Sequence, residues 1–275
     1  MSRPYRLKNL LLVAVAGFAF SLSGVAQNSA QCPNPSSWSY PSTNWATLYP
    51  QCCSQANAST KDIQQSPINI TTVTENANLT LQTSYFSATV PVVDNGHSIE
   101  VDYDNPPPGS KPNYVTWNGT QYNLLQFHFH QPNEHQINGA PTGAEQMEVH
   151  LVNVHTDAEG NQSFLVIGVL VNKGAANEGF GKILTHIGRT DSLDPVQMIP
   201  GTNNIKNPKL YTYMGSLTTP GCTPPITWVV LKEPITFSEA QLNSHGALHG
   251  GKYATTSRGV QTAITGLTVN SNFKP

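Results

Sequence analysis

The chain has 275 residues and a formal net charge of −2, and only 11% of its residues are charged. Apolar residues make up 38%, which is enough for the core of one large domain or of two small ones. The charges form no basic stripe and no polybasic cluster, so neither nucleic acid nor an acidic lipid surface is an expected partner.

The first 26 residues have the pattern of a secretory signal peptide. A basic start is followed by an apolar run over residues 10–20 and by small residues that end at Ala26. The run is too short for a confident membrane span, so an uncleaved anchor is the weaker alternative. We therefore expect a leader at 1–26, and residues 27–275 as one secreted or periplasmic domain that does not contact the membrane after cleavage.

Four cysteines follow the leader: Cys32, Cys52, Cys53 and Cys222. Export favours disulfides, and the chain lacks the C-x-x-C pair of a cysteine zinc site or a redox motif. Adjacent cysteines rarely bridge each other, so two pairings remain open. Both imply a long-range bridge to Cys222.

From about residue 68 the sequence has the alternation or the continuous apolar runs of β-strands. The segments are 79–85, 97–103, 122–130, 147–154, 164–171 and 226–231. Turns rich in Pro and Gly separate them, at 106–109, 138–141 and 220–221. Only 181–187 and 238–242 are expected to form short helices, the second with Ser238 as its N-cap. One β-rich domain is the simplest interpretation.

Two of the strand segments carry histidines in a pattern that suits a metal. Residues two apart on a strand point to the same face, so His128 and His130 project together. His150 lies on the next strong strand, after a segment whose Pro and Gly residues allow the chain to turn back. Gln126 shares the face of His128, and Glu148 shares that of His150, so both can accept hydrogen bonds from the imidazoles.

The chemistry of these ligands favours zinc. Three neutral imidazoles suit Zn²⁺, and three protein ligands leave the fourth position of the metal for water. A structural zinc site is instead expected to close with a fourth ligand. The pattern therefore predicts a catalytic zinc site held by His128, His130 and His150.

From about residue 38 to its end, the chain resembles the α-carbonic anhydrases. The motifs that carry this resemblance occur in the order of that family, and together they are specific. They are Trp-Ser-Tyr at 38–40, Gln-Ser-Pro-Ile-Asn-Ile at 65–70, Asn-Gly-His at 95–97, Gln-Phe-His-Phe-His at 126–130, Glu-His at 134–135, Glu-Val-His-Leu-Val at 148–152, Gly-Ser-Leu-Thr-Thr-Pro at 215–220, Thr-Trp-Val-Val-Leu at 227–231 and Asn-Phe-Lys-Pro at 272–275.

The resemblance implies a mainly β fold: a single domain around a large, twisted, mostly antiparallel sheet of about ten strands, with a few short helices. It also implies an enzyme that reversibly hydrates carbon dioxide to bicarbonate and a proton, through hydroxide formed at zinc. The expected partners are these small molecules, with a homodimer as an open alternative.

The resemblance further assigns roles to residues. Thr218 would accept a hydrogen bond from the hydroxide and donate one to Glu134, and His97 would carry protons to solvent. The carbon dioxide pocket would be lined by Val152, Val166, Leu217 and Trp228, and Thr219 would contact bicarbonate. The residues that support the site would be Gln126, Glu148, Tyr40 and Asn95. A disulfide would join Cys222 to Cys52 or Cys53.

Two other functions are considered. The spacing of His128, His130 and Glu134 also fits the first metal motif of cupin-type dioxygenases, in which the glutamate is a fourth ligand. The Pro-x-Gly at 141–143, however, lies too far from His150 for the second cupin motif. The other alternative is a non-catalytic carbonic-anhydrase-like binding module; inactive relatives lose zinc histidines, and here all three are present.

Overall fold

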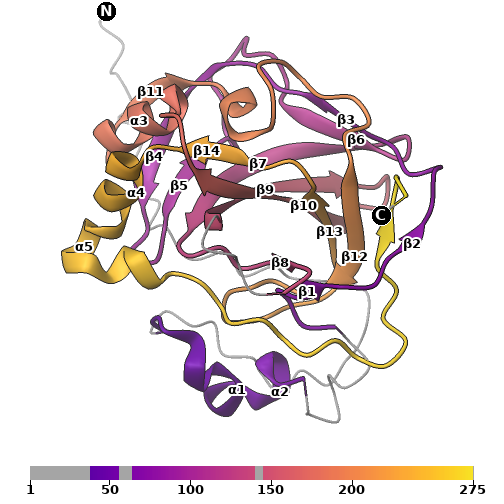
Figure 1. Cartoon of the computed structure of the whole chain (residues 1–275). Coiled ribbons are helices and arrows are strands. Elements are labelled where there is room, and N and C mark those ends of the chain that lie inside the picture. Colours follow the sequence, from indigo (N-terminus) through magenta and orange to yellow (C-terminus); the bar gives the residue numbers. More distant parts are fainter. Residues whose placement is uncertain (1–37, 56–63, 140–144, 275) are drawn as a thin grey trace, which may run out of the picture.

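The structure is a computed structural model, and it describes residues 38–55, 64–139 and 145–274 (Figure 1). The expected leader at 1–26 and Cys32 lie outside the described residues. In the described ranges, no helix is both long enough and apolar enough to cross a membrane.

A strongly twisted sheet forms the body of the molecule (Figure 1), and its described part has 13 strands. Ten of them follow the order β11-β4-β5-β7-β9-β10-β13-β12-β15-β2, while β3, β6 and β14 pair beside this path. The strands are β2 Thr74–Glu75, β3 Leu81–Ser84, β4 Ala88–Asp94, β5 Ile99–Asp102, β6 Tyr114–Trp117, β7 Thr120–His130, β9 Glu145–Thr156, β10 Gln162–Lys173, β11 Thr190–Leu193, β12 Leu210–Gly215, β13 Ile226–Leu231, β14 Ile235–Phe237 and β15 Asn270–Ser271.

Most of the strand pairs are antiparallel. The exceptions in the large sheet are β10 with β13, β10 with β14, and β15 with β2. A separate parallel pair joins β1 (Asn69–Ile70) to β8 (Gln136–Ile137). The predicted fold class is therefore confirmed.

The helices are short and lie outside the sheet. Figure 1 shows α3, α4 and α5 along one side of the sheet, and α1 and α2 on another side. The α-helices are α1 Trp45–Leu48, α2 Pro50–Cys53, α3 Glu178–Thr185, α4 Glu239–Gly246 and α5 Leu248–Gly251; the 3₁₀ turns are η1 Ser42–Asn44, η2 Pro195–Met198 and η3 Lys252–Thr255.

The strands β7, β9 and β10 lie at the centre of the core, and their apolar side chains are buried against it. Phe127 and Phe129 are fully buried on the side opposite the histidines. The continuous apolar run of β10 is buried from Leu165 to Val171. This burial on both faces of β10 is why its sequence shows no alternation.

Candidate metal and catalytic site

The pairing of β7 with β9 brings the three predicted zinc ligands together. His128 lies directly opposite His150 in the antiparallel register, and His130 is two residues further along β7. Each residue offers one nitrogen, and these nitrogens all lie within 4.8 Å of one another. The side chains predicted to share a face therefore do so.

Two of the imidazoles are oriented by the side chains that the sequence predicted. The Nδ1 of His128 is 2.8 Å from the Gln126 Oε1, and the Nε2 of His150 is 3.0 Å from the Glu148 Oε1. Each contact uses one ring nitrogen as a donor, and this leaves the lone pair of the other nitrogen for a metal.

The third imidazole, His130, gives the clearest test of whether the site suits a metal. Its Nδ1 is 2.6 Å from the Thr256 carbonyl oxygen, and the Tyr40 hydroxyl is 3.5 Å from the same nitrogen. Its Nε2 is buried and has no hydrogen-bond partner among the described residues. A buried nitrogen without a partner is costly unless a ligand is bound to it, so the residues fit zinc.

Burial also keeps the three rings in the form that binds metal. It lowers the pKa of His128 well below its ordinary value and that of His130 to about 4, and it lowers the pKa of His150 as well. The rings are therefore neutral at pH 7 and each retains a lone pair.

Glu148 is a fully buried carboxylate that meets donors on all sides. Its Oε1 contacts the His135 Nδ1 at 2.7 Å as well as His150, and its Oε2 accepts from the backbone N–H groups of Glu134 and His135 at 2.9 and 2.7 Å. Burial alone would raise the pKa of Glu148, but the contacts with His135 and His150 hold it well below its ordinary value. The ionised carboxylate is therefore a fixed acceptor for His150.

Glu134, the predicted partner of Thr218, is buried beside the histidines. Its Oε1 accepts from the Arg258 backbone N–H at 2.7 Å, whereas its Oε2 has no hydrogen-bond partner in the described part of the chain. Burial raises the pKa of Glu134 to about 7, and the proximity of His150 and of the Thr218 hydroxyl acts in the opposite direction.

The loop that carries Thr218 is held at several points. Its backbone closes on itself through Leu217 N–H to Thr223 O at 3.0 Å and Cys222 N–H to Thr219 O at 2.8 Å. The indole N–H of Trp228 on β13 donates to the Ser216 carbonyl at 2.9 Å.

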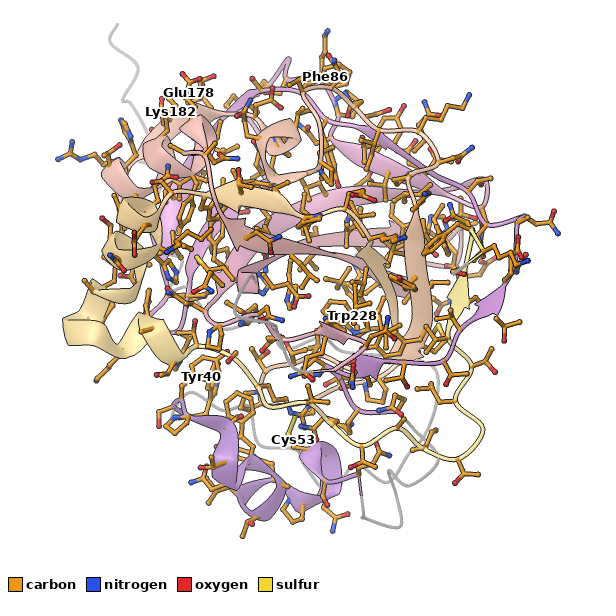
Figure 2. The ribbon with its side chains drawn as sticks, in the orientation of Figure 1. Tyr40, Cys53, Phe86, Glu178, Lys182 and Trp228 are labelled. Atoms are coloured by element: carbon orange, nitrogen blue, oxygen red, sulfur yellow. A yellow bond between two sulfur atoms is a disulfide. The ribbon has the colours of Figure 1, made fainter. Side chains whose placement is uncertain are left out.

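The four residues predicted to line the pocket belong to one apolar cluster. Val166 and Trp228 are buried, and Val152 and Leu217 pack against them while partly exposed. Trp228, labelled in Figure 2, lies with its ring centroid 4.8 Å from that of His150. Thr219, beside Thr218 on the loop, is also partly exposed.

His97 stands apart from the zinc histidines, on the turn between β4 and β5. It precedes Glu100, the cross-strand partner of His128, by three residues, which is roughly 10 Å along an extended chain. Its ring stacks on Trp38 with centroids 3.8 Å apart and planes 13° apart, and burial lowers the pKa of His97. The Asn95 Oδ1 accepts from the His97 and Ser98 N–H groups, so Asn95 contacts this turn rather than an imidazole of the zinc site.

Two functional groups near the site were missed in the sequence. The Thr256 carbonyl orients His130, but any residue presents such a carbonyl, so no signal could have revealed it. Glu100 faces the same side of the sheet as His128 because the two are cross-strand partners, and burial raises the pKa of Glu100 to about 7. Its alternation with the buried Ile99 and Val101 is a signal that could have placed it there.

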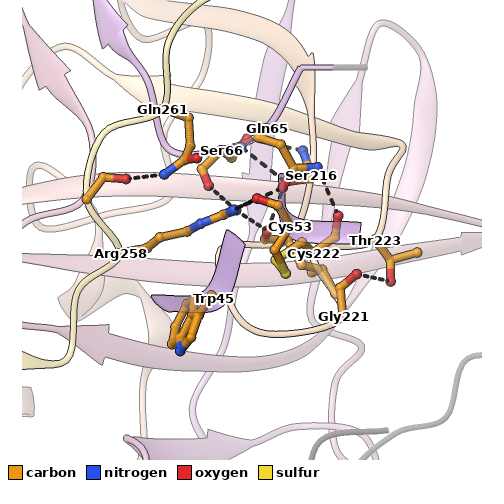
Figure 3. The surroundings of a disulfide bond; sticks show 12 residues. Trp45, Cys53, Gln65, Ser66, Ser216, Gly221, Cys222, Thr223, Arg258 and Gln261 are labelled. Carbon is orange, nitrogen blue, oxygen red and sulfur yellow. Dashed lines mark hydrogen bonds between the residues drawn. A yellow bond between two sulfur atoms is a disulfide. The ribbon is translucent and has the colours of Figure 1, made fainter. Parts of the chain in front are cut away.

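Arg258 was also missed, and it connects the site to the predicted disulfide (Figure 3). Its guanidinium donates to the carbonyl oxygens of Ser66 and Cys53 and to the Gln65 Oε1, at 2.7, 2.9 and 3.0 Å. The disulfide joins Cys53 to Cys222, so of the two alternatives for Cys222 the partner is Cys53.

Residues 41–265 match the family model of the eukaryotic-type carbonic anhydrases. The chain belongs to this family. A carbonic anhydrase of Neisseria gonorrhoeae is 31% identical over 243 residues, which cover 86% of each chain. One of Klebsiella pneumoniae is 32% identical over 226 residues, or 78% of this chain and 85% of the relative.

Solved carbonic anhydrases share the fold. The α-carbonic anhydrase of Thermovibrio ammonificans, in complex with the inhibitor sulfanilamide, superposes with a TM-score of 0.67 at 29% identity and covers 85% of this chain and 98% of that one. That of Photobacterium profundum has a TM-score of 0.66 at 26% identity, with 85% and 99% covered.

Membership of the carbonic anhydrases confirms the predicted family and its zinc cofactor, for which His128, His130 and His150 are positioned. It also removes the cupin alternative, because the match extends over most of the chain rather than over one histidine motif.

Proposed function

We propose that this protein reversibly hydrates carbon dioxide to bicarbonate and a proton, in a zinc site held by His128, His130 and His150. The single observation that carries the proposal is the His130 Nε2, a buried nitrogen that has no hydrogen-bond partner among the described residues and belongs to a histidine triad of a carbonic anhydrase chain. Zinc, when bound, supplies a nucleophile by lowering the pKa of a water toward neutrality, as is established for carbonic anhydrases in general.

Glu134 and Thr218 orient the nucleophile. Glu134 in its ionised form is an acceptor only, so the Thr218 hydroxyl donates its proton to that carboxylate. The oxygen of Thr218 is then left only as a hydrogen-bond acceptor, and it accepts from the nucleophile in one fixed orientation. The neighbouring backbone N–H of Arg258 occupies the Glu134 Oε1, which leaves the Oε2 for Thr218.

The apolar cluster provides the place for carbon dioxide. Val152, Val166, Leu217 and Trp228 present no strong hydrogen-bonding group to a substrate that carries no charge, so the substrate is held without competing for the metal. Thr219 adds a hydroxyl at the edge of this cluster, where it can hold the more polar bicarbonate.

His97 carries the released proton to solvent. A histidine suits this task because the ordinary pKa of an imidazole, about 6.5, is close to neutral pH, and the partial exposure of His97 gives it access to bulk buffer. His97 lies roughly 10 Å along the chain from Glu100, the cross-strand partner of His128, so intervening water completes the path to the zinc site.

The protein is exported and acts outside the cytoplasm. The leader-like residues 1–26 direct its export, and residues 27–275 form the catalytic domain that is secreted or remains in the periplasm. The Cys53–Cys222 disulfide supports an oxidising compartment.

Stopped-flow hydration of carbon dioxide tests the proposed activity, with wild-type protein and with His128→Ala. We expect fast hydration by the wild type that sulfanilamide blocks, and loss of both zinc and activity in His128→Ala. The matched control is His186→Ala, which removes a half-exposed histidine and should change neither. Equal activity of His128→Ala and wild type would contradict the zinc role and favour the binding-module alternative.

A further inference from the structure

Asp94, the last residue of β4, is held by two residues that are distant in sequence. The Tyr253 hydroxyl donates to its Oδ1 at 2.5 Å, and the His249 Nε2 lies 2.7 Å from its Oδ2. Burial raises the pKa of Asp94, but hydrogen bonds from Tyr253, Gly96 and His249 lower it below its ordinary value. The carboxylate is therefore ionised at neutral pH, and each of its oxygens is engaged.

The same carboxylate begins the turn that carries His97. The Asp94 Oδ1 accepts from the Gly96 N–H at 3.0 Å, and the Asn95 Oδ1 accepts from the N–H groups of His97 and Ser98 at 2.9 and 2.8 Å. The Asn95 N–H donates to the Ser98 carbonyl at 3.2 Å. Each backbone N–H from Asn95 to Ser98 is thus bound within the turn, so a shift of Asp94 moves the turn as a unit.

The segment that holds Asp94 also contacts the strand of the zinc ligands. We call residues 245–256 the C-terminal bridge. The His245 Nδ1 is 2.9 Å from the Gln131 Oε1, and the Thr256 N–H and hydroxyl pair with the backbone of Gln131 at 2.8 and 3.1 Å. Gln131 directly follows His130, and the Thr256 carbonyl binds the His130 ring.

The backbone of the C-terminal bridge is strained in the stretch that contacts Asp94. His249 has a φ of 51°, and Gly250 and Gly251 have φ values of 68° and 94°. A left-handed conformation is unfavourable for a histidine and persists only where surrounding contacts enforce it. The contact of His249 with Asp94 is one that does so.

We propose that the C-terminal bridge sets the position of the proton-carrying His97 relative to the zinc histidines, with Asp94, His249 and Tyr253 as positioning residues for proton transfer. This inference rests on the proposed role of His97. Both ends of the C-terminal bridge, at His245 and Thr256, contact Gln131 beside His130, and its middle holds Asp94 at the start of the turn of His97. The C-terminal bridge therefore determines the length of the water path between His130 and His97.

Tyr253→Phe tests the inference because it removes the hydroxyl donor and keeps the buried ring. We expect turnover (kcat) in weak buffer to fall between about two-fold and ten-fold, with kcat/KM and zinc content unchanged, since the rate of proton transfer depends steeply on position. His249→Ala should have the same effect. Imidazole buffer should restore turnover in both variants.

His97→Ala serves as the reference, and His186→Ala, which breaks another His–Asp pair, is the matched control. In the His97→Ala background, Tyr253→Phe should cause no further loss. A fall in kcat/KM or in zinc content with Tyr253→Phe would show a general structural role and overturn the inference. If turnover is unchanged in Tyr253→Phe and His249→Ala but falls in His97→Ala, the inference about the C-terminal bridge is overturned and the role of His97 stands. If turnover does not fall in His97→Ala, the proposed role of His97 as proton carrier is contradicted.

Discussion

At the scale of single residues, the chemistry depends on how buried polar atoms are satisfied. The three zinc histidines each use one ring nitrogen as a donor to an acceptor that the protein supplies, namely the Gln126 amide, the Glu148 carboxylate and the Thr256 carbonyl. The remaining nitrogens converge. The residue types and their spacing predicted the three histidines and the two side-chain acceptors, Gln126 and Glu148. They could not predict the Thr256 carbonyl, because every residue has a backbone carbonyl.

The first prediction at this scale concerns Glu134. Glu134→Gln replaces an acceptor-only carboxylate by an amide that also donates, so Thr218 is no longer fixed as a donor. We expect hydration of carbon dioxide to fall about 100-fold or more, in the range found for loss of an orienting group, while zinc remains bound. Stopped-flow kinetics and metal analysis of one sample provide the check. Full activity would remove Glu134 from the mechanism.

The second prediction concerns His97. Removing its imidazole should lower kcat in weak buffer by about ten-fold or more and leave kcat/KM unchanged, because carbon dioxide capture precedes proton export. In the wild type, burial lowers the pKa of His97, so the ring is neutral and able to accept a proton at pH 7. The contribution of His97 to hydration should therefore be lost as the pH falls through that lowered pKa. A His97→Ala profile identical to that of the wild type at all pH values would contradict this role.

At the scale of elements, periodicity predicted those strands that lie at the centre of the sheet. The segments 122–130, 147–154 and 164–171 correspond to β7, β9 and β10, and segment 226–231 coincides with β13. Strand β4 was missed, and its sequence includes Pro91, which breaks the expected pattern. The structure accommodates this residue because β4 pairs with β11 along its first half and with β5 along its second half.

The helix at 238–242 was predicted from its cap, and the structure extends it to Gly246. Ser238 accepts from the Gln241 N–H, and the Gln241 side chain accepts from the Ser238 N–H, which completes a capping box. The helix at 181–187 begins earlier than expected, at Glu178, because Asn177 caps it. The pattern of apolar positions alone does not reveal such a cap.

The cap of α4 gives the third prediction. Ser238→Ala removes the acceptor for the Gln241 N–H and should lower the free energy of unfolding by about 1 kcal/mol. Urea unfolding measures the change. Ser244→Ala, at an exposed position inside the same helix, is the control and should change stability by less than about 0.5 kcal/mol. Equal effects of the two substitutions would show that the cap does not stabilise the helix.

At the scale of the whole molecule, the site depends on contacts between segments that are far apart in sequence. Arg258 contacts Ser66 and Cys53 across 192 and 205 residues, and the Cys53–Cys222 disulfide spans 169 residues. Together they tie α2 and the loop of Thr218 to the C-terminal part of the chain (Figure 3). No local pattern predicts such partners, and for this reason the sequence left the choice between Cys52 and Cys53 open.

The disulfide gives the fourth prediction. Replacing both Cys53 and Cys222 by serine should lower the free energy of unfolding by about 2–5 kcal/mol, because the disulfide restricts the conformations of a long stretch of the unfolded chain. The double variant avoids an unpaired thiol, and urea unfolding again provides the measurement. Zinc binding should persist, since the three histidines lie on β7 and β9 and not on α2 or the loop of Thr218, the two segments that the disulfide joins. Unchanged stability would mean that the disulfide does not stabilise the fold beyond the contacts of Arg258.

Zinc reconstitution of the mature protein tests the central claim most directly. Metal should first be removed with a chelator, and stopped-flow hydration of carbon dioxide should then be followed as Zn²⁺ is added back. We predict that activity rises in proportion to zinc, stops at one zinc per chain, and is never recovered by His130→Ala. Hydration that survives removal of the metal, or that zinc does not restore in the wild type, would contradict a zinc enzyme built on His128, His130 and His150.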